Sequence, residues 1–120
     1  MNLLFDDMPS YRTGIGLLAI HSAISLSDAI KVGLTGKKAK YQDHARASLE
    51  LERICSSAGV GDKRGLVHFK WLLAQKTAIA YSQDRLDDSS LRQAVDKAQK
   101  FNAWAYNCFR EILRDTEAQA

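Results

Sequence analysis

Proline is almost absent from this chain, because its single residue of this type is Pro9. Proline breaks the interior of a helix, so residues 10–120 are free to form long helices. Runs of β-branched residues are also missing, whereas Ala, Leu, Lys, Gln and Arg are frequent and favour helix. A chain of 120 residues suffices for one domain with one core. We therefore expect a single all-α domain over residues 1–120.

Cysteine is also scarce, and the two residues present, Cys55 and Cys108, are far apart. Their spacing matches neither a metal-binding motif nor a disulfide framework. We therefore expect two free thiols in a reducing cytoplasm, with no metal and no cofactor. The N-terminal stretch MNLLFDDMP is acidic and lacks the apolar core of a signal peptide. The longest apolar run ends at His21, so the sequence predicts no membrane span and no contact with a membrane.

Four segments of the chain repeat apolar residues at three- and four-residue intervals, the spacing of a helix with one buried face. Ser10 is expected to cap the first helix and Gly36 to end it, and Asp62 is expected to cap the third. The expected helices run from the cap at Ser10 to Gly36, over about 41–58, over about 63–82, and from Asp88 or Ser89 to about Asp115.

Helices of these lengths with short connections are predicted to form an up-down antiparallel four-helix bundle, with room for a short extra helix at the N-terminus. In that topology the connections at 35–42 and 83–90 share one end of the bundle. The 59–62 turn then shares the other end with the N-terminus. The expected core face of the first helix consists of Ile15, Leu18, Ser22, Leu26, Ala29, Ile30 and Gly33.

Two histidines and two aspartates lie around the connection that follows the first expected helix. Asp28 lies towards the end of that helix, and Asp43 and His44 lie at the start of the next, so these three can meet. His21 lies about 10 Å from Asp28 along the helix axis and would not join them. We interpret the four as polar contacts that hold the first two helices in register, with ligand binding at the 35–46 end as a further role. Ligands at i, i+4 and a Glu-x-x-His pattern are both absent, so no metal site is predicted.

Positive charge gathers in the same region of the chain. The chain has 17 Lys and Arg against 14 Asp and Glu, and the net charge of +3 permits an anionic partner without requiring one. Residues 31–46 contain a single acidic residue, Asp43, and five basic residues, which are Lys31, Lys37, Lys38, Lys40 and Arg46. Phosphate groups would be drawn to such a segment, but no glycine-rich loop specifies a nucleotide. The candidate binding residues are Asp28, Lys37, Lys38, Lys40, Asp43, His44 and Arg46.

Arg64 and His68 form a second candidate pair, because they lie four residues apart on one face of the third expected helix. Such a pair suits RNA cleavage, with the histidine as general acid or base and the arginine on the phosphate. The alternative is an exposed pair without a chemical role. Nucleophilic catalysis has no other support, since both cysteines fall in core patterns and no serine lies in an elbow motif.

The order of these residues resembles the HEPN superfamily of small helical bundles over about residues 10–115. The matching features are His21-Ser-Ala-Ile, Asp28-Ala-Ile, the helix-ending Gly36, Gln42-Asp43-His44, a helix with Lys76 and Tyr81, and a last helix lined by Ala98, Phe101, Trp104 and Ala105. The resemblance implies a four- to five-helix up-down bundle and a two-fold homodimer. It also implies links to RNA or nucleotides, often beside a small nucleotidyltransferase partner in toxin–antitoxin or defence systems.

Catalytic members of that superfamily are metal-independent RNases with an arginine, four to six intervening residues and a histidine. Arg85 is the candidate arginine, but Ser90, Leu91 and Arg92 occupy the positions where the histidine should fall. We therefore assign no catalytic residue and predict a non-catalytic, dimeric HEPN-like module that contacts RNA, a nucleotide or a partner protein. The alternatives are a divergent RNase that uses Arg64 and His68 or Asp43 and His44, and a structural assembly protein.

Overall fold

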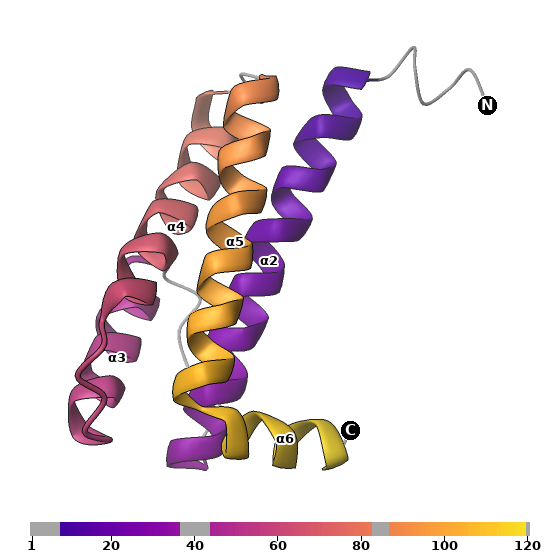
Figure 1. Cartoon of the computed structure of the whole chain (residues 1–120). Helices are drawn as coiled ribbons and strands as arrows, with labels where there is room; N and C mark the ends of the chain where they lie inside the picture. The colour runs from indigo at the N-terminus through magenta and orange to yellow at the C-terminus, as the bar shows by residue number, and fades with distance from the viewer. Residues whose placement is uncertain (1–7, 37–43, 83–86, 120) are drawn as a thin grey trace.

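The structure of this protein is a computed structural model that describes residues 8–36, 44–82 and 87–119. All elements in these ranges are helices, which confirms the all-α prediction (Figure 1). They are α2 (Met8–Thr35), α3 (His44–Ser57), α4 (Arg64–Ser82), α5 (Asp88–Cys108) and α6 (Arg110–Gln119). Four main helices and one short C-terminal helix pack together.

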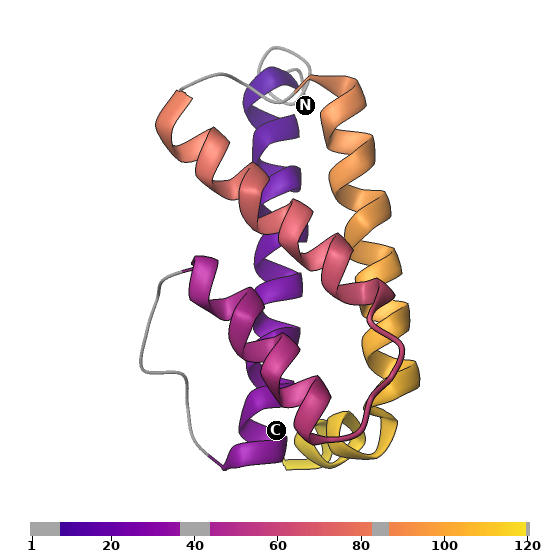
Figure 2. The ribbon, with the colours of Figure 1, turned by 90° about the vertical axis from the view of Figure 1, so that its left-hand side faces the viewer.

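The directions of the helices differ from the predicted up-down order. In both ribbon views α2, α3 and α5 run one way along the molecule, and α4 runs the other way (Figures 1 and 2). α3 begins about half-way along the molecule and runs parallel to the second half of α2, and α4 continues along the same side towards the start of α2. The ends of α2 and α4 therefore lie at opposite ends of the molecule. The predicted meeting of the connections that follow these two helices is wrong.

Two of the predicted helix bounds are also corrected. α2 begins at Met8 rather than after a cap at Ser10, so Pro9 lies in its first turn. Proline is tolerated there, because the N–H groups of the first turn have no hydrogen-bond partner within the helix. The fourth predicted helix is interrupted at Phe109, whose backbone has φ −129° and ψ 32°. The side chain of Phe109 is buried and meets the Trp104 ring edge-on at 5.9 Å between centroids. α6 then turns away from α5 and forms a short C-terminal helix (Figure 1). The part of the chain before Met8, where we expected a short extra helix, lies outside the described residues.

The core lies between α2, α3, α4 and α5 and is closed at one end by α6. An aromatic series runs through it, with Phe69 stacked on Phe101 at 4.9 Å and Phe101 tilted against Trp104 at 5.7 Å. The buried apolar residues are Ile20, Ala23, Ile30, Leu51, Cys55, Leu66, Phe69, Leu72, Leu73, Ala94, Ala98, Phe101, Trp104, Ala105, Phe109 and Leu113. On α2 the predicted face is only partly buried, because Ile30 lies in the core and Leu26 and Ala29 pack against it, whereas Leu18 and Ser22 are exposed.

The contact that joins α2 to α3 is an ion pair that the sequence did not predict. Lys31 is buried, with 3% of its surface exposed, and its Nζ lies 3.4 Å from Oε2 of Glu50. A buried lysine needs such a partner, because an unpaired charge in the interior costs several kcal/mol. Lys31 is therefore not part of a basic surface. His21 and Asp28 are exposed, and the predicted contact of Asp28 with Asp43 and His44 falls on side chains outside the described residues.

The apolar character of α2 is unusual for a helix at the surface of a bundle. By length and composition, Thr13–Thr35 passes the test for a segment able to cross a membrane, and 33% of the window tested is buried inside the structure. The core helix of a soluble protein passes the same test. The sequence argument that His21 excludes a span was therefore too strong, and the absence of membrane contact stays a prediction.

Candidate functional site

The predicted binding residues fall into two groups in the structure. Asp28 on α2 and Arg46 on α3 have exposed side chains. The others lie outside the described residues or, for His44, have a side chain outside them: Lys37, Lys38, Lys40, Asp43 and His44. Arg85 also lies outside the described ranges. The predicted cluster of Asp28, Asp43 and His44 therefore stays a prediction.

Arg64 and His68 lie together on a concave part of the surface. They line a hollow of about 250 Å³ between the first turns of α4 and the second half of α5. The remaining lining residues are Asp62, Gly65, Lys100, Ala103, Trp104 and Asn107. We call these eight residues the α4–α5 hollow. The spacing of Arg64 and His68 predicted their shared face, but nothing in the sequence indicated that Lys100 and Trp104 would complete the site.

Asp62 organises the wall of the hollow at the start of α4. Its Oδ1 accepts hydrogen bonds from the backbone N–H and from Nε of Arg64, at 3.1 and 3.0 Å, which confirms the predicted capping role. Its Oδ2 accepts from Nη2 of Arg64 at 2.8 Å. These hydrogen bonds lower the pKa of the Asp62 carboxyl to about 2, and the side-chain hydrogen bonds from Arg64 have the largest effect. The arginine is thus oriented by its own neighbour, although its guanidinium is exposed to solvent.

Trp104 forms the floor of the hollow and ties α5 to the start of α4. Its indole Nε1 donates a hydrogen bond to the backbone oxygen of Asp62 at 2.8 Å. The ring lies against Gly65, and a Cβ atom at that position would collide with the ring carbons. Glycine is therefore required for this close approach of α4 and α5.

His68 is the most unusual polar group in the hollow. It is half-buried, and its Nδ1 is buried with no hydrogen-bond partner in the described part of the chain. Burial lowers the pKa of His68, and Lys97 and Lys100 lower it further because they are positively charged. The imidazole is therefore neutral at neutral pH and has an unused hydrogen-bonding atom.

The lowered pKa of His68 predicts a loss of stability in mild acid. The unfolded chain binds a proton at this residue more readily than the folded chain does. The contribution of neutral His68 is therefore complete above the ordinary histidine pKa of about 6.5 and is lost as the pH falls towards the lower folded-state pKa. His68→Gln cannot titrate, so its urea midpoint is expected to fall less than that of the wild type between about pH 7.5 and pH 5. Equal falls in the two proteins would contradict the assignment.

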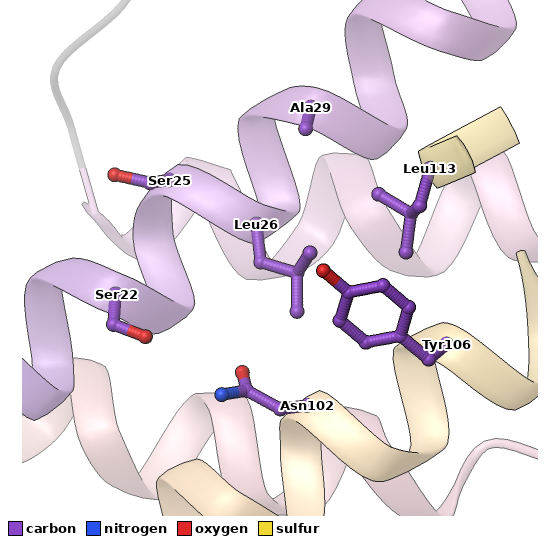
Figure 3. A pocket seen from close by; sticks show the side chains of 7 residues that line it. All are labelled: Ser22, Ser25, Leu26, Ala29, Asn102, Tyr106 and Leu113. Carbon is purple, nitrogen blue, oxygen red and sulfur yellow. The ribbon is translucent and has the colours of Figure 1, made fainter. Parts of the chain in front are cut away.

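A second concavity lies along α2 and has little charge. Its volume is about 350 Å³, and Figure 3 shows the residues around it: Ser22, Ser25, Leu26, Ala29, Asn102, Tyr106 and Leu113. Oδ1 of Asn102 is buried without a hydrogen-bond partner among the described residues. No charged or nucleophilic group lines this groove apart from hydroxyls. It therefore offers a surface for contact rather than a site for a reaction.

Neither the cysteines nor a metal adds reactive groups to the described part of the chain. Burial raises the pKa of the Cys55 thiol to about 11 and also raises that of Cys108, so both remain protonated and unreactive at neutral pH. Both thiols are free, as predicted. Within the described ranges no three His, Cys, Asp or Glu side chains are grouped so as to hold a metal ion.

Comparison with known proteins gives no further assignment. No protein family, no curated protein and no solved structure matches this chain.

Proposed function

We propose that this chain is a non-catalytic, HEPN-like binding module that holds phosphate groups of RNA or of a nucleotide in the α4–α5 hollow. The observation that carries the proposal is that His68, whose Nδ1 has no hydrogen-bond partner among the described residues, lines one concavity with two cationic side chains, Arg64 and Lys100. A buried polar atom without a partner costs free energy, which a bound acceptor or donor would recover.

The chemistry of the hollow fits an anionic group such as a phosphate better than a neutral sugar. Arg64 offers a planar set of donors, and Lys100 adds a mobile cation. The N–H of neutral His68 adds one hydrogen-bond donor for a phosphate oxygen. Asp62 and Asp96 moderate this charge, since Asp96 pairs with Lys100 at 3.0 Å. A site with partly neutralised cations favours weak, reversible binding of a backbone phosphate.

Charge reversal at Lys100 is expected to weaken binding of a short single-stranded RNA about tenfold, the effect of losing one charge-assisted hydrogen bond. Lys70→Glu is the matched control, because Lys70 and Lys100 are similarly exposed, at 53% and 56% of their side chains, and each pairs with one acid. Lys70 is not among the residues of the hollow. Fluorescence anisotropy at fixed salt measures both variants, which have the same net charge.

Three ligands distinguish whether the bound phosphate belongs to RNA, to a nucleotide or to the free anion. Thermal shifts with the RNA, with ATP and with inorganic phosphate show whether a chain of phosphates, a nucleotide or the anion alone is bound. Equal weakening of RNA binding by the two lysine variants would mean general attraction to net charge and would refute the proposed site. Failure of all three ligands to stabilise the protein would refute the proposal as a whole.

A divergent metal-independent RNase is the second candidate, because Arg64 and His68 line the same hollow. His68 would act as general acid or base, and the arginine would bind the phosphate. RNA cleavage that is abolished by His68→Ala would favour this function over simple binding. A contact with a small nucleotidyltransferase, and contacts of RNA with Lys37, Lys38, Lys40 and Arg46, stay predictions from the resemblance and from the charge pattern.

A further inference from the structure

The concavity along α2 has a different chemistry from the α4–α5 hollow, because no charged side chain lines it. We call the seven residues labelled in Figure 3 the α2–α5 groove. Their side chains come from α2, α5 and α6, so the groove is formed by tertiary packing and not by one helix (Figure 3). None of these residues lines the α4–α5 hollow. Whatever binds in the groove is therefore independent of the proposed phosphate site.

The hydrogen-bonding groups of the groove are uncharged. They include the hydroxyls of Ser22 and Tyr106 and the amide of Asn102. Figure 3 shows Asn102 and Tyr106 on α5 turned towards Leu26 on α2. Hydroxyl and amide groups can both donate and accept hydrogen bonds. A charged ligand would lose its hydration here without meeting an opposite charge, which is unfavourable. The groove therefore suits a neutral ligand with hydrogen-bonding groups.

Asn102 has hydrogen-bonding capacity that the described part of the chain does not use. Its Oδ1 is buried and has no partner among the described residues, although the residue as a whole is only partly buried. Burying such an oxygen without a partner costs free energy, which a leucine of similar size would avoid. No described hydrogen bond holds this oxygen in place. Rotation about the last side-chain bond, which has a broad energy profile, can therefore turn either end of the amide to the groove.

The remaining walls of the groove are apolar and limit the size of the ligand. Leu26, Ala29 and Leu113 line it, and Tyr106 is 41% exposed although its ring is largely apolar. The volume of about 350 Å³ lies at the lower end of the range for ligand sites in proteins. A flat ring can contact a tyrosine ring and aliphatic side chains at the same time. These walls therefore favour a small planar molecule.

We propose that the α2–α5 groove binds a small, neutral, planar molecule that carries a carboxamide group. A carboxamide has an N–H donor beside a carbonyl acceptor, and the Asn102 amide has the same two groups, so each can satisfy the other. The hydroxyls of Ser22 and Tyr106 provide further partners, and the ring of the ligand contacts Leu26 and Leu113. A ketone of the same shape has no donor for the Asn102 oxygen. A carboxylate of the same shape brings a charge that nothing in the groove neutralises.

Three probes of nearly identical shape test this chemistry on the full-length chain: benzamide, acetophenone and benzoate. Backbone amide signals of the groove residues, followed by NMR during titration, report binding at this place. Benzamide is expected to shift them saturably, and acetophenone is expected to bind about tenfold more weakly, the effect of one lost hydrogen bond. Benzoate is expected not to bind in the groove. Equal binding of benzoate and benzamide, or no saturable shift with benzamide, would overturn the proposal.

Two variants and a matched control locate the binding. Asn102→Leu is expected to keep its far-UV circular dichroism and to bind benzamide at least about tenfold more weakly. Ser22→Leu is expected to abolish binding, because it fills the groove from α2 at an exposed position outside the core. Ser89→Leu, the same change at an exposed serine of α5 outside the groove, is expected to bind like the wild type. If Asn102→Leu does not fold, Ser22→Leu decides. Unchanged benzamide binding in Ser22→Leu would refute the proposed site.

Discussion

Replacing Phe101 by alanine is expected to reduce the free energy of unfolding by about 3–5 kcal/mol, the usual effect of removing a buried aromatic ring. Phe101 has 0% of its surface exposed and lies on α5, the helix that packs against both α4 and α2. Its ring stacks on Phe69 at 4.9 Å and touches Trp104 at 5.7 Å between centroids. The loss therefore combines the transfer free energy of one ring with a cavity at the centre of the fold. The free energy of unfolding of natural domains is only about 5–15 kcal/mol, so this loss is a large part of it.

Urea unfolding followed by far-UV circular dichroism measures this loss. Protein concentration must be the same for all variants, because dimer formation would make apparent stability depend on it. Val67→Ala is the control, since Val67 is 65% exposed and its truncation is expected to change stability by less than about 0.5 kcal/mol. A loss below about 1 kcal/mol for Phe101→Ala would mean that the aromatic series does not form the centre of the core.

The positions of the helices along the chain could be predicted from the sequence, because the three- and four-residue spacing of apolar residues is a property of each single helix. The third and fourth segments show this, since Leu66, Phe69, Ala98 and Phe101 are buried as their spacing indicates. The direction of α3 could not be predicted in the same way, because an apolar stripe is the same whichever way the helix runs. The break at Phe109 was missed for a related reason. Apolar residues continue at helical spacing across it, and the packing of Phe109 on Trp104 overrides that local pattern.

The buried face of α2 shows a different limit of the sequence argument. Apolar residues occur all around this helix, so several stripes satisfy helical spacing equally well. The predicted stripe includes Ile30, which is buried, but also Leu18 and Ser22, which are exposed, and it misses the buried Ile20 and Ala23. A choice between such faces depends on the neighbouring helices, which the sequence of α2 does not contain.

Only those residues of the candidate site that lie close together in the sequence, at the start of one helix, could be predicted. Arg64 and His68 share a face because they are four residues apart, and Asp62 was a foreseeable cap. Lys100 and Trp104 come from α5 and complete the hollow only through tertiary packing. Lys31 shows the same dependence, because a lysine is ordinarily solvated and this one is buried only beside Glu50 of α3.

The Gly65→Ala variant is expected to lose about 1–3 kcal/mol of stability, although alanine is the better helix former. A Cβ atom at position 65 would collide with the Trp104 ring. That ring cannot move aside easily, because its Nε1 donates to the Asp62 oxygen at 2.8 Å and its other side meets Phe101 and Phe109. The added methyl therefore forces either a displaced α4 or a broken hydrogen bond.

Gly14→Ala is the matched control for this change, because it adds the same methyl group to another helix. Nothing lies within 4 Å of a Cβ atom built at Gly14, so alanine there is expected to raise stability by about 0.5–1 kcal/mol. Thermal unfolding should thus move the two variants in opposite directions from the wild type. A shift of tryptophan fluorescence in Gly65→Ala alone would show that the Trp104 ring has moved. If both variants were stabilised, α4 and α5 would not approach closely at Gly65, and the floor of the α4–α5 hollow would have to be placed elsewhere.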